Sequence, residues 1–163
     1  FTMQTACSWA LGRELFGIPV KRALKVGVIQ AECDVGDLAE SYRGVTSAMD
    51  LSREDKALLR ENLRFFTETT KTGKDFADLV RKIVVRMQLD VIFCDPLLSY
   101  VGGDLSKQEV ASHFLRNLIQ PILKDTGCII VFTHHEGKPK PKEVTEGQTI
   151  SDRHIPGLGV PNS

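Results

Sequence analysis

The sequence has 163 residues, of which 42% are hydrophobic and 26% are charged, an ordinary composition for a soluble domain. This length suits a single domain with its own buried core. The 21 Lys and Arg residues balance the 21 Asp and Glu residues, so the formal net charge is zero and a surface that is basic throughout is excluded. Any site for DNA or another polyanion must therefore be local. No apolar run approaches the roughly 20 residues that a membrane-spanning helix requires.

The first half of the chain alternates between helical and strand patterns. Apolar residues at three-to-four spacing predict a helix over residues 3–16. The apolar run 26–31 predicts a strand that is covered on both faces. Residues 37–61 are mostly helical by pattern, and Ser52 is placed to cap a second piece of that stretch.

The second half continues the alternation. Three more strands are predicted, at residues 63–67, 91–94 and 128–133. A helix is expected to begin at Asp75, with apolar residues along one side. Ser106 is expected to cap a long helix that runs to about residue 124, and Pro121 inside it predicts a kink or a division into two.

The cysteines indicate a reducing compartment. The four thiols form no CxxC pair, and no histidine lies at a spacing typical of zinc ligands. Three of them lie in or beside apolar stretches, where a free cysteine behaves as a small hydrophobic residue. No signal-peptide pattern opens the chain. We therefore expect reduced thiols in a cytoplasmic protein.

The alternating order predicts a three-layer α/β domain with a mainly parallel sheet. Polar or ionisable groups follow three of the predicted strands: Glu32, Asp95, and the pair His134 and His135. In open parallel sheets, ligands bind just outside the carboxyl ends of the strands. These groups are therefore expected to converge on one rim of the sheet.

Each rim residue suits a step of phosphate chemistry and also has a plainer interpretation. Asp95, at the end of a wholly apolar strand, suits a Mg²⁺ ion beside a phosphate, although it would also suit a helix cap. Glu32 suits a carboxylate that polarises an attacking water, or an ordinary solvated acid. One of His134 and His135 suits hydrogen bonding to a γ-phosphate, whereas either one would also serve as a structural histidine.

A basic segment follows the last predicted strand. Lys138, Lys140 and Lys142 alternate with prolines, and Arg153 lies further on. Such a loop is expected to be extended and cationic, which suits contact with a phosphate backbone. The alternative is a solvated surface. The segment contains no aromatic residue, which argues against base stacking.

Four stretches of the sequence together resemble the RecA-like P-loop ATPases, and most closely the RepA-type hexameric replicative helicases and their phage or prophage relatives. The stretches are VGVIQAECDVGDLAE, LDVIFCDPLLSYVGGD, FLRNLIQPILKDTGCIIVFTHHEGKPK and IPGLGV. The resemblance covers nearly the whole chain, and its most specific parts are CDPLLSYVGGD and GCIIVFTHHEGK.

The resemblance implies a role for each rim residue. It matches Asp95 to the Walker B acid that holds Mg²⁺, and Glu32 to the carboxylate that activates water. It matches His134 and His135 to the sensor of the γ-phosphate, with His135 preferred. The loops after Asp95 and after His135 match those that contact single-stranded DNA in a hexameric ring. ATP, Mg²⁺ and single-stranded DNA are thus the implied ligands.

One family motif is missing. The phosphate-binding loop, G-x-x-x-x-G-K followed by Ser or Thr, occurs nowhere in the sequence. The chain is therefore expected to start just after this loop and to lack the last strands, so that residues 1–163 are one RecA-like domain incomplete at both ends. Residues 136–163 would form the DNA-binding loop and the approach to those strands. Alone, this piece is expected to be inactive.

Three functions fit this sequence. The first is the ATP-hydrolysing motor core of a replicative-helicase-like protein. The second is a RecA-like regulatory ATPase that acts on protein partners. The third is a degenerate ATPase module without catalysis, retained as a scaffold.

Overall fold

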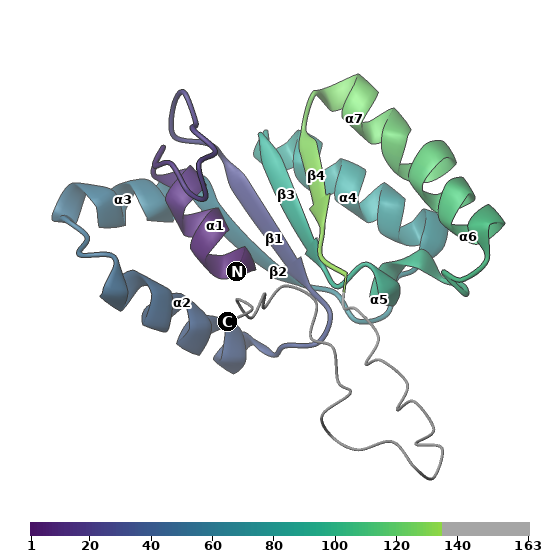
Figure 1. Cartoon of the computed structure of the whole chain (residues 1–163), viewed down its shortest axis with the longest axis horizontal. Coiled ribbons are helices and arrows are strands. Elements are labelled where there is room, and N and C mark those ends of the chain that lie inside the picture. The colour runs from purple at the N-terminus through teal and green to yellow at the C-terminus, as the bar shows by residue number, and fades with distance from the viewer. Residues whose placement is uncertain (135–163) are drawn as a thin grey trace, which may run out of the picture.

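The computed structural model describes residues 1–134, in which the strands form one parallel sheet (Figure 1). The strands are β1 (Val26–Gln30), β2 (Leu63–Thr67), β3 (Val91–Asp95) and β4 (Ile129–Phe132). Their order in the sheet is β2-β1-β3-β4, and each neighbouring pair is parallel. The predicted α/β class with a parallel sheet is confirmed.

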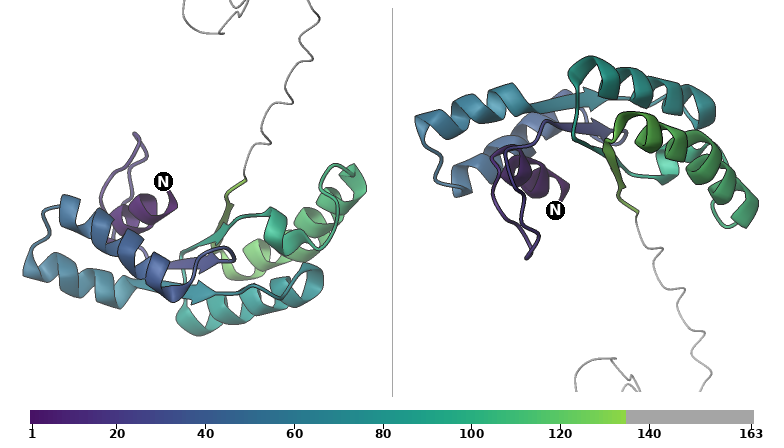
Figure 2. Two further views of the ribbon diagram at one scale, coloured as in Figure 1. Left: turned by 90° about the horizontal axis from the view of Figure 1, so that it is seen from below. Right: turned by 90° about the horizontal axis from the view of Figure 1, so that it is seen from above.

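Helices cover both faces of this sheet (Figure 2). On one face lie α1 (Thr2–Ala10), α2 (Val35–Ala48) and α3 (Arg53–Asn62). On the other lie α4 (Gly73–Met87), α5 (Leu98–Val101), α6 (Gln108–Ser112), the π-helix η1 (His113–Ile119) and α7 (Gln120–Thr126). The fold is thus the expected three-layer arrangement, consistent with a RecA-like core.

Two hydrophobic clusters hold the layers together, one on each face of the sheet. Successive side chains of a strand point to opposite faces, so β1 and β3 supply both clusters. The side toward α1 takes Val26, Val28, Val91 and Phe93. The side toward α4 takes Ile29, Ile92 and Cys94. The first four residues of each of these two strands are buried, which confirms the prediction of a strand covered on both faces.

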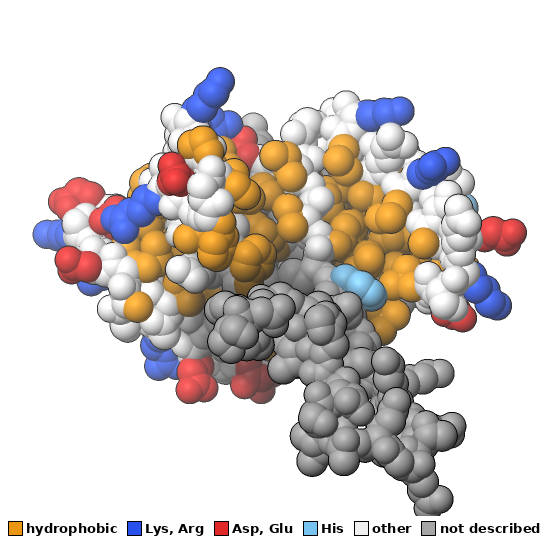
Figure 3. All heavy atoms as spheres, in the orientation of Figure 1, with side chains coloured by type: hydrophobic (Ala, Val, Ile, Leu, Met, Phe, Trp, Pro, Cys, Tyr) orange, Lys and Arg blue, Asp and Glu red, His pale blue; other side chains and the backbone are white. Residues whose placement is uncertain are grey.

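The edge strand β4 is much less buried than its apolar sequence suggests. Ile129 is 56% exposed, and the remaining residues of β4 are only half-buried. Leu115 and Leu123, on the neighbouring helical segments, are also exposed. Hydrophobic side chains accordingly gather on the face shown in Figure 3. The exposure of β4 follows from its place at the edge of the sheet, because within the described residues β4 has a strand partner on one side only.

The prediction of a helix over residues 3–16 is wrong in its second half. Helix α1 ends at Ala10, and Gly12 turns the chain with φ +71°. A Cβ atom on Gly12 would lie 2.8 Å from the backbone nitrogen of Ala23, so the returning chain passes too close for any larger residue. Phe16 matches the helical spacing but is 61% exposed in the turn beyond.

The predicted cap at Ser106 is also wrong. Both the backbone N–H and the hydroxyl of Ser106 donate to Asp104 Oδ1, at 2.9 and 2.7 Å, which forms a local turn. The helix begins two residues later, at Gln108. Asp104 therefore holds Ser106 in this turn, ahead of the start of the helix.

The predicted division of the helix near Pro121 is confirmed, and a π-helical segment separates the two α-helical pieces. Pro121 has no N–H to donate, and inside an α-helix its ring would clash with the carbonyl one turn earlier. The chain switches to π geometry over His113–Ile119 and starts α7 at Gln120, which places Pro121 in its first turn. The predicted second piece after Ser52 is likewise confirmed, because Ser52 and Asp55 form a capping box at the start of α3.

The burial of the cysteines agrees with the sequence analysis, which placed three of the four in or beside apolar stretches. All four cysteines are free, and Cys7, Cys94 and Cys128 are buried. Within residues 1–134, no helix combines the length and apolar character needed to cross a membrane.

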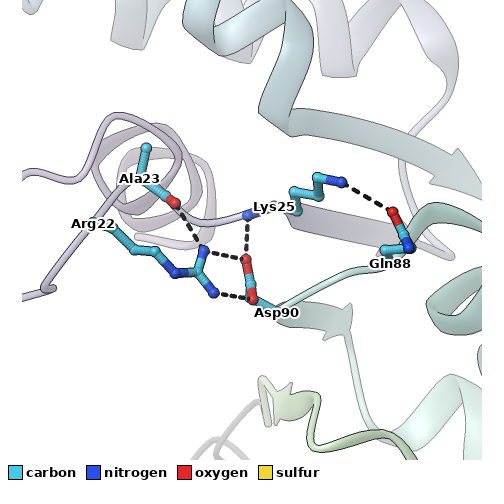
Figure 4. Close-up of polar contacts among 5 residues, drawn as sticks. All are labelled: Arg22, Ala23, Lys25, Gln88 and Asp90. Carbon is cyan, nitrogen blue, oxygen red and sulfur yellow. Dashed lines mark hydrogen bonds and ion pairs between the residues drawn. The ribbon is translucent and has the colours of Figure 1, made fainter.

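A bidentate ion pair ties the loop after α1 to the amino end of β3 (Figure 4). The Asp90 carboxylate accepts hydrogen bonds from Arg22 Nη1 and Nη2, at 2.9 and 2.6 Å, and from the backbone N–H of Lys25 at 2.8 Å. The hydrogen bond from Arg22 is the main reason that the pKa of Asp90 lies below its usual range. This clamp of Arg22, Lys25 and Asp90 fixes the entry into β1 beside β3.

Replacing Asp90 with Asn should lower the free energy of unfolding by about 1–3 kcal/mol at neutral pH, because charge-assisted hydrogen bonds are lost. The folded-state pKa of Asp90 is depressed, so its contribution is complete above the unfolded pKa of about 3.9 and disappears as the pH falls through the folded value. Urea unfolding of both proteins at a series of pH values measures this difference.

The matched control is Asp78→Asn, because Asp78 forms an exposed ion pair with Lys74 one helical turn away. Such a solvent-exposed pair contributes little to the free energy of unfolding, because water screens it. Equal losses in the two variants would contradict the role of the clamp.

Candidate functional site

The polar groups that follow the strands meet at one rim, which also receives the amino end of α1. The strands run toward the lower edge of the sheet in Figure 1, where the start of α1 lies. The register places Gln30 opposite both Thr67 and Asp95, so β1, β2 and β3 end level with one another. Thr133 follows the end of β4 and donates its backbone N–H to the carbonyl of Cys94.

Asp95 is the centre of this rim, because its carboxylate accepts hydrogen bonds from three separate parts of the fold. Thr2 Oγ1 and Gln30 Nε2 each donate to Oδ2 at 3.1 Å. The hydroxyl of Thr133 donates to Oδ1. A carboxylate oxygen accepts hydrogen bonds, and each of these three contacts supplies it with a donor. The structure thus brings together α1, β1, β3 and the segment after β4, whereas the sequence pointed to the strand ends and not to α1.

The alternative interpretation of Asp95 as a helix cap does not fit the geometry. The next helix, α5, begins at Leu98, and its first turn has no hydrogen bond from a capping side chain. The backbone N–H of Ser99 donates instead to the carbonyl of Pro96, at 3.2 Å. The Asp95 carboxylate faces the rim contacts rather than the helix.

Glu32 lies on a turn that is anchored at both ends. The backbone N–H of Ala31 donates to the carbonyl of Asp95 at 3.1 Å, which holds the start of the turn. Asp34 and Asp37 form a capping box that starts α2 and fixes its other end. Glu32 is exposed on this turn. The chain therefore presents a carboxylate two residues beyond the strand that neighbours Asp95.

The pKa of the Cys33 thiol responds to these acidic groups. Burial is the largest cause that raises the pKa of the Cys33 thiol, and nearby carboxylates add to it. The carboxylates that contribute belong to Asp37, Asp95, Glu32 and Asp34. Glu32 and Asp95 thus act on the same thiol, which places both in one electrostatic neighbourhood.

The sequence analysis missed Glu68, which follows β2 at the same rim. Its backbone N–H donates to the carbonyl of Gln30 at 2.9 Å. Its carboxylate accepts from the N–H and hydroxyl of Thr70, both at 2.8 Å, and from the N–H of Lys71 at 3.0 Å. The hydrogen bond from the Thr70 N–H is the largest cause that lowers the pKa of Glu68. Through these hydrogen bonds, the Glu68 carboxylate holds the loop that follows β2 in place.

Tyr100 was also missed, although it forms the floor beneath Asp95. It is fully buried, its ring stacks on Phe76 with centroids 3.9 Å apart, and its hydroxyl donates to the backbone carbonyl of Asp95 at 3.5 Å. Burial is the main cause that raises the pKa of Tyr100. A sequence signal existed for Glu68, an acid that follows a strand as Glu32 does, but none existed for Tyr100.

The donors at the rim fit magnesium bound together with a phosphate. Within residues 1–134, no group of three or more His, Cys, Asp or Glu side chains is arranged to hold a metal alone. Magnesium often binds through one or two carboxylates and completes its shell with waters and substrate phosphates. Asp95 supplies such a carboxylate, because in P-loop ATPases an Asp holds the ion together with the Ser or Thr of the phosphate-binding loop, a motif that this sequence does not contain.

The other predicted site residues are only partly described. His134 is exposed directly after Thr133, so the structure brings it to the rim. His135, Lys138, Lys140, Lys142 and Arg153 lie outside the described residues. Their roles stay predictions.

A family model described as an AAA domain matches residues 1–141. This match spans most of the chain, so the chain belongs to that AAA-domain family, whose general character is that of a nucleotide-binding ATPase. No curated protein matches the sequence. The general P-loop ATPase relation is therefore confirmed, whereas the RepA-type helicase relation stays a prediction.

Cys33 offers a native probe of the acidic rim, because the other three thiols are buried. Removing the charge of Glu32 by Glu32→Gln should lower the pKa of Cys33 and increase its alkylation rate by iodoacetamide at pH 8 by about 1.5- to 3-fold. Mass spectrometry of the peptide that contains Cys33 measures the rate. Glu40→Gln, at an exposed position on α2, is the control. Equal rates in the two variants would place Glu32 away from Cys33.

Proposed function

We propose that this AAA-domain chain is the ATP-hydrolysing motor core of a replicative-helicase-like, DNA-binding protein. Magnesium and ATP bind at the rim, and the loops that follow β3 and β4 contact single-stranded DNA. The observation that carries the proposal is the Asp95 carboxylate, which is fixed by side chains from α1, β1 and the segment after β4.

Phosphoryl transfer suits this arrangement, because its catalysis rests on positioning and on electrostatic stabilisation. The first turn of a helix offers backbone N–H groups and a partial positive charge to an anion. Here the first turn of α1 lies beside Asp95, as the hydrogen bond from Thr2 shows. A phosphate at that turn would stand next to the magnesium ligand.

Each rim residue then has a defined task. Asp95, with the Thr2 hydroxyl, holds the magnesium ion, which when bound neutralises charge on the phosphate oxygens. Glu32 orients the attacking water and accepts its proton. His134 or His135 donates a hydrogen bond to the γ-phosphate and so reports whether it is present. Tyr100 and Glu68 keep the two neighbouring loops in place.

The assembled protein is proposed to be a homo-hexameric ring. Head-to-tail contacts between identical subunits close into a ring when the rotation between them permits. In such a ring the loop that contains Gly102 and Gly103, and the basic segment with Lys138, Lys140 and Lys142, face the DNA. A regulatory ATPase that acts on protein partners would share the rim but would not need the basic segment.

Glu32→Gln in the full-length protein should reduce the rate of ATP hydrolysis by about 10²- to 10⁴-fold, because the general base is lost while the shape is retained. Nucleotide binding should change little, because Asp95 and α1 are intact. Steady-state hydrolysis with and without single-stranded DNA, together with nucleotide titration, separates the two effects. Glu40→Gln should behave as the unmodified protein, and equal turnover in both variants would remove Glu32 from the catalytic role.

Replacing Lys138, Lys140 and Lys142 with Ala should weaken binding of single-stranded DNA and flatten its salt dependence. Each phosphate contact contributes about 0.7 to the slope of log K against log salt concentration for single strands. Titration of a labelled oligonucleotide at several salt concentrations measures the slope. Lys56→Ala, on the exposed side of α3, is the control. An unchanged slope would favour the regulatory ATPase.

A further inference from the structure

Gln30, the last residue of β1, is the polar end of a strand whose other four residues are buried. Its side chain is half-buried, and an amide taken from water without a partner costs free energy. Gln30 Nε2 has its partner in Asp95 Oδ2, at 3.1 Å. The parallel register sets these two residues directly opposite each other, so the pairing is built into the sheet.

We propose that Gln30 is a positioning residue for Asp95, which holds the carboxylate in the orientation that binds magnesium. This inference rests on the proposed function, in which Asp95 is the magnesium ligand. The three donors around Asp95 differ in chemistry. The hydroxyls of Thr2 and Thr133 carry lone pairs and can turn toward a cation or a phosphate, whereas the amide nitrogen of Gln30 can only donate. Orientation is therefore the task that its contact with the carboxylate can perform.

The persistence of the contact also distinguishes Gln30 from Thr2, which shares the same carboxylate oxygen. If the Thr2 hydroxyl turns toward magnesium, Oδ2 loses one of its two side-chain donors. Gln30 then still holds that oxygen, while Thr133 holds Oδ1. Outer-shell hydrogen bonds of this kind orient metal ligands and influence their affinity.

Gln30 also connects the magnesium ligand to the turn that carries Glu32. Its backbone carbonyl accepts the N–H of Glu68 at 2.9 Å, and the next residue, Ala31, donates its N–H to the Asp95 carbonyl at 3.1 Å. The end of β1 is thus held on one side by the residue that follows β2 and on the other side by the last residue of β3. Glu32 follows two residues later, so the relative placement of Asp95 and Glu32 depends on this point.

The test is the magnesium dependence of ATP hydrolysis by the full-length protein at saturating ATP. Gln30→Met keeps the length and volume of the side chain and removes the donor. It should raise the magnesium concentration for half-maximal hydrolysis by about 10-fold or more, as loss of outer-shell partners does. Gln30→Asn keeps an amide with shorter reach and should give a smaller increase. Gln120→Met, at an exposed position on α7, is the matched control and should give none.

Two parallel measurements separate positioning from a merely structural role. Binding of ADP without magnesium and the midpoint of urea unfolding should both stay close to the unmodified values in Gln30→Asn. Lower stability with an unchanged magnesium requirement in both Gln30 variants would overturn the inference. If the unmodified protein shows no magnesium-dependent hydrolysis, the proposed function itself fails. If it hydrolyses ATP and the variants match it, only the role of Gln30 fails.

Discussion

The register between β1 and β3 is the constraint on which the rest of the structure depends. Five residues of one strand face five of the other, from the pair Val26 and Val91 to the pair Gln30 and Asp95. A slip of one residue would turn every side chain to the opposite face and would break both hydrophobic clusters. The core therefore fixes the register, and the register in turn fixes which polar groups meet at the rim. Site geometry is here a consequence of hydrophobic packing.

Much of this architecture could be predicted from local patterns. Short apolar runs identified all four strands, and the ionisable residues directly after them identified Asp95 and Glu32 as rim groups. Such predictions succeed because burial on two faces demands a continuous apolar run, and because parallel strands end at one edge. The division of the last helical stretch followed equally directly from the missing N–H of Pro121.

The rest depended on contacts that no local pattern encodes. The hydrogen bond from Thr2 to Asp95 joins residues 93 positions apart, and only the packing of α1 on the sheet brings them together. The end of α1 was placed too late because Leu15 and Phe16 continue the helical spacing, whereas the turn at Gly12 is imposed by the returning chain. Ser106 is not the cap because Asp104, two residues earlier, holds it in a local turn and the helix begins only at Gln108.

An acidic residue lies at each end of strand β3, and the two make different contacts. Asp90 precedes it and joins the loop after α1, whereas Asp95 closes it at the rim. The two residues are five positions apart, which is about 17 Å along an extended chain. Substitutions so far apart, without shared partners, usually combine additively in free energy. The fold can thus gain or lose stability at the Asp90 end of β3 while the contacts of Asp95 at the other end are left unchanged, so stability and the geometry of the rim are separately adjustable in this domain.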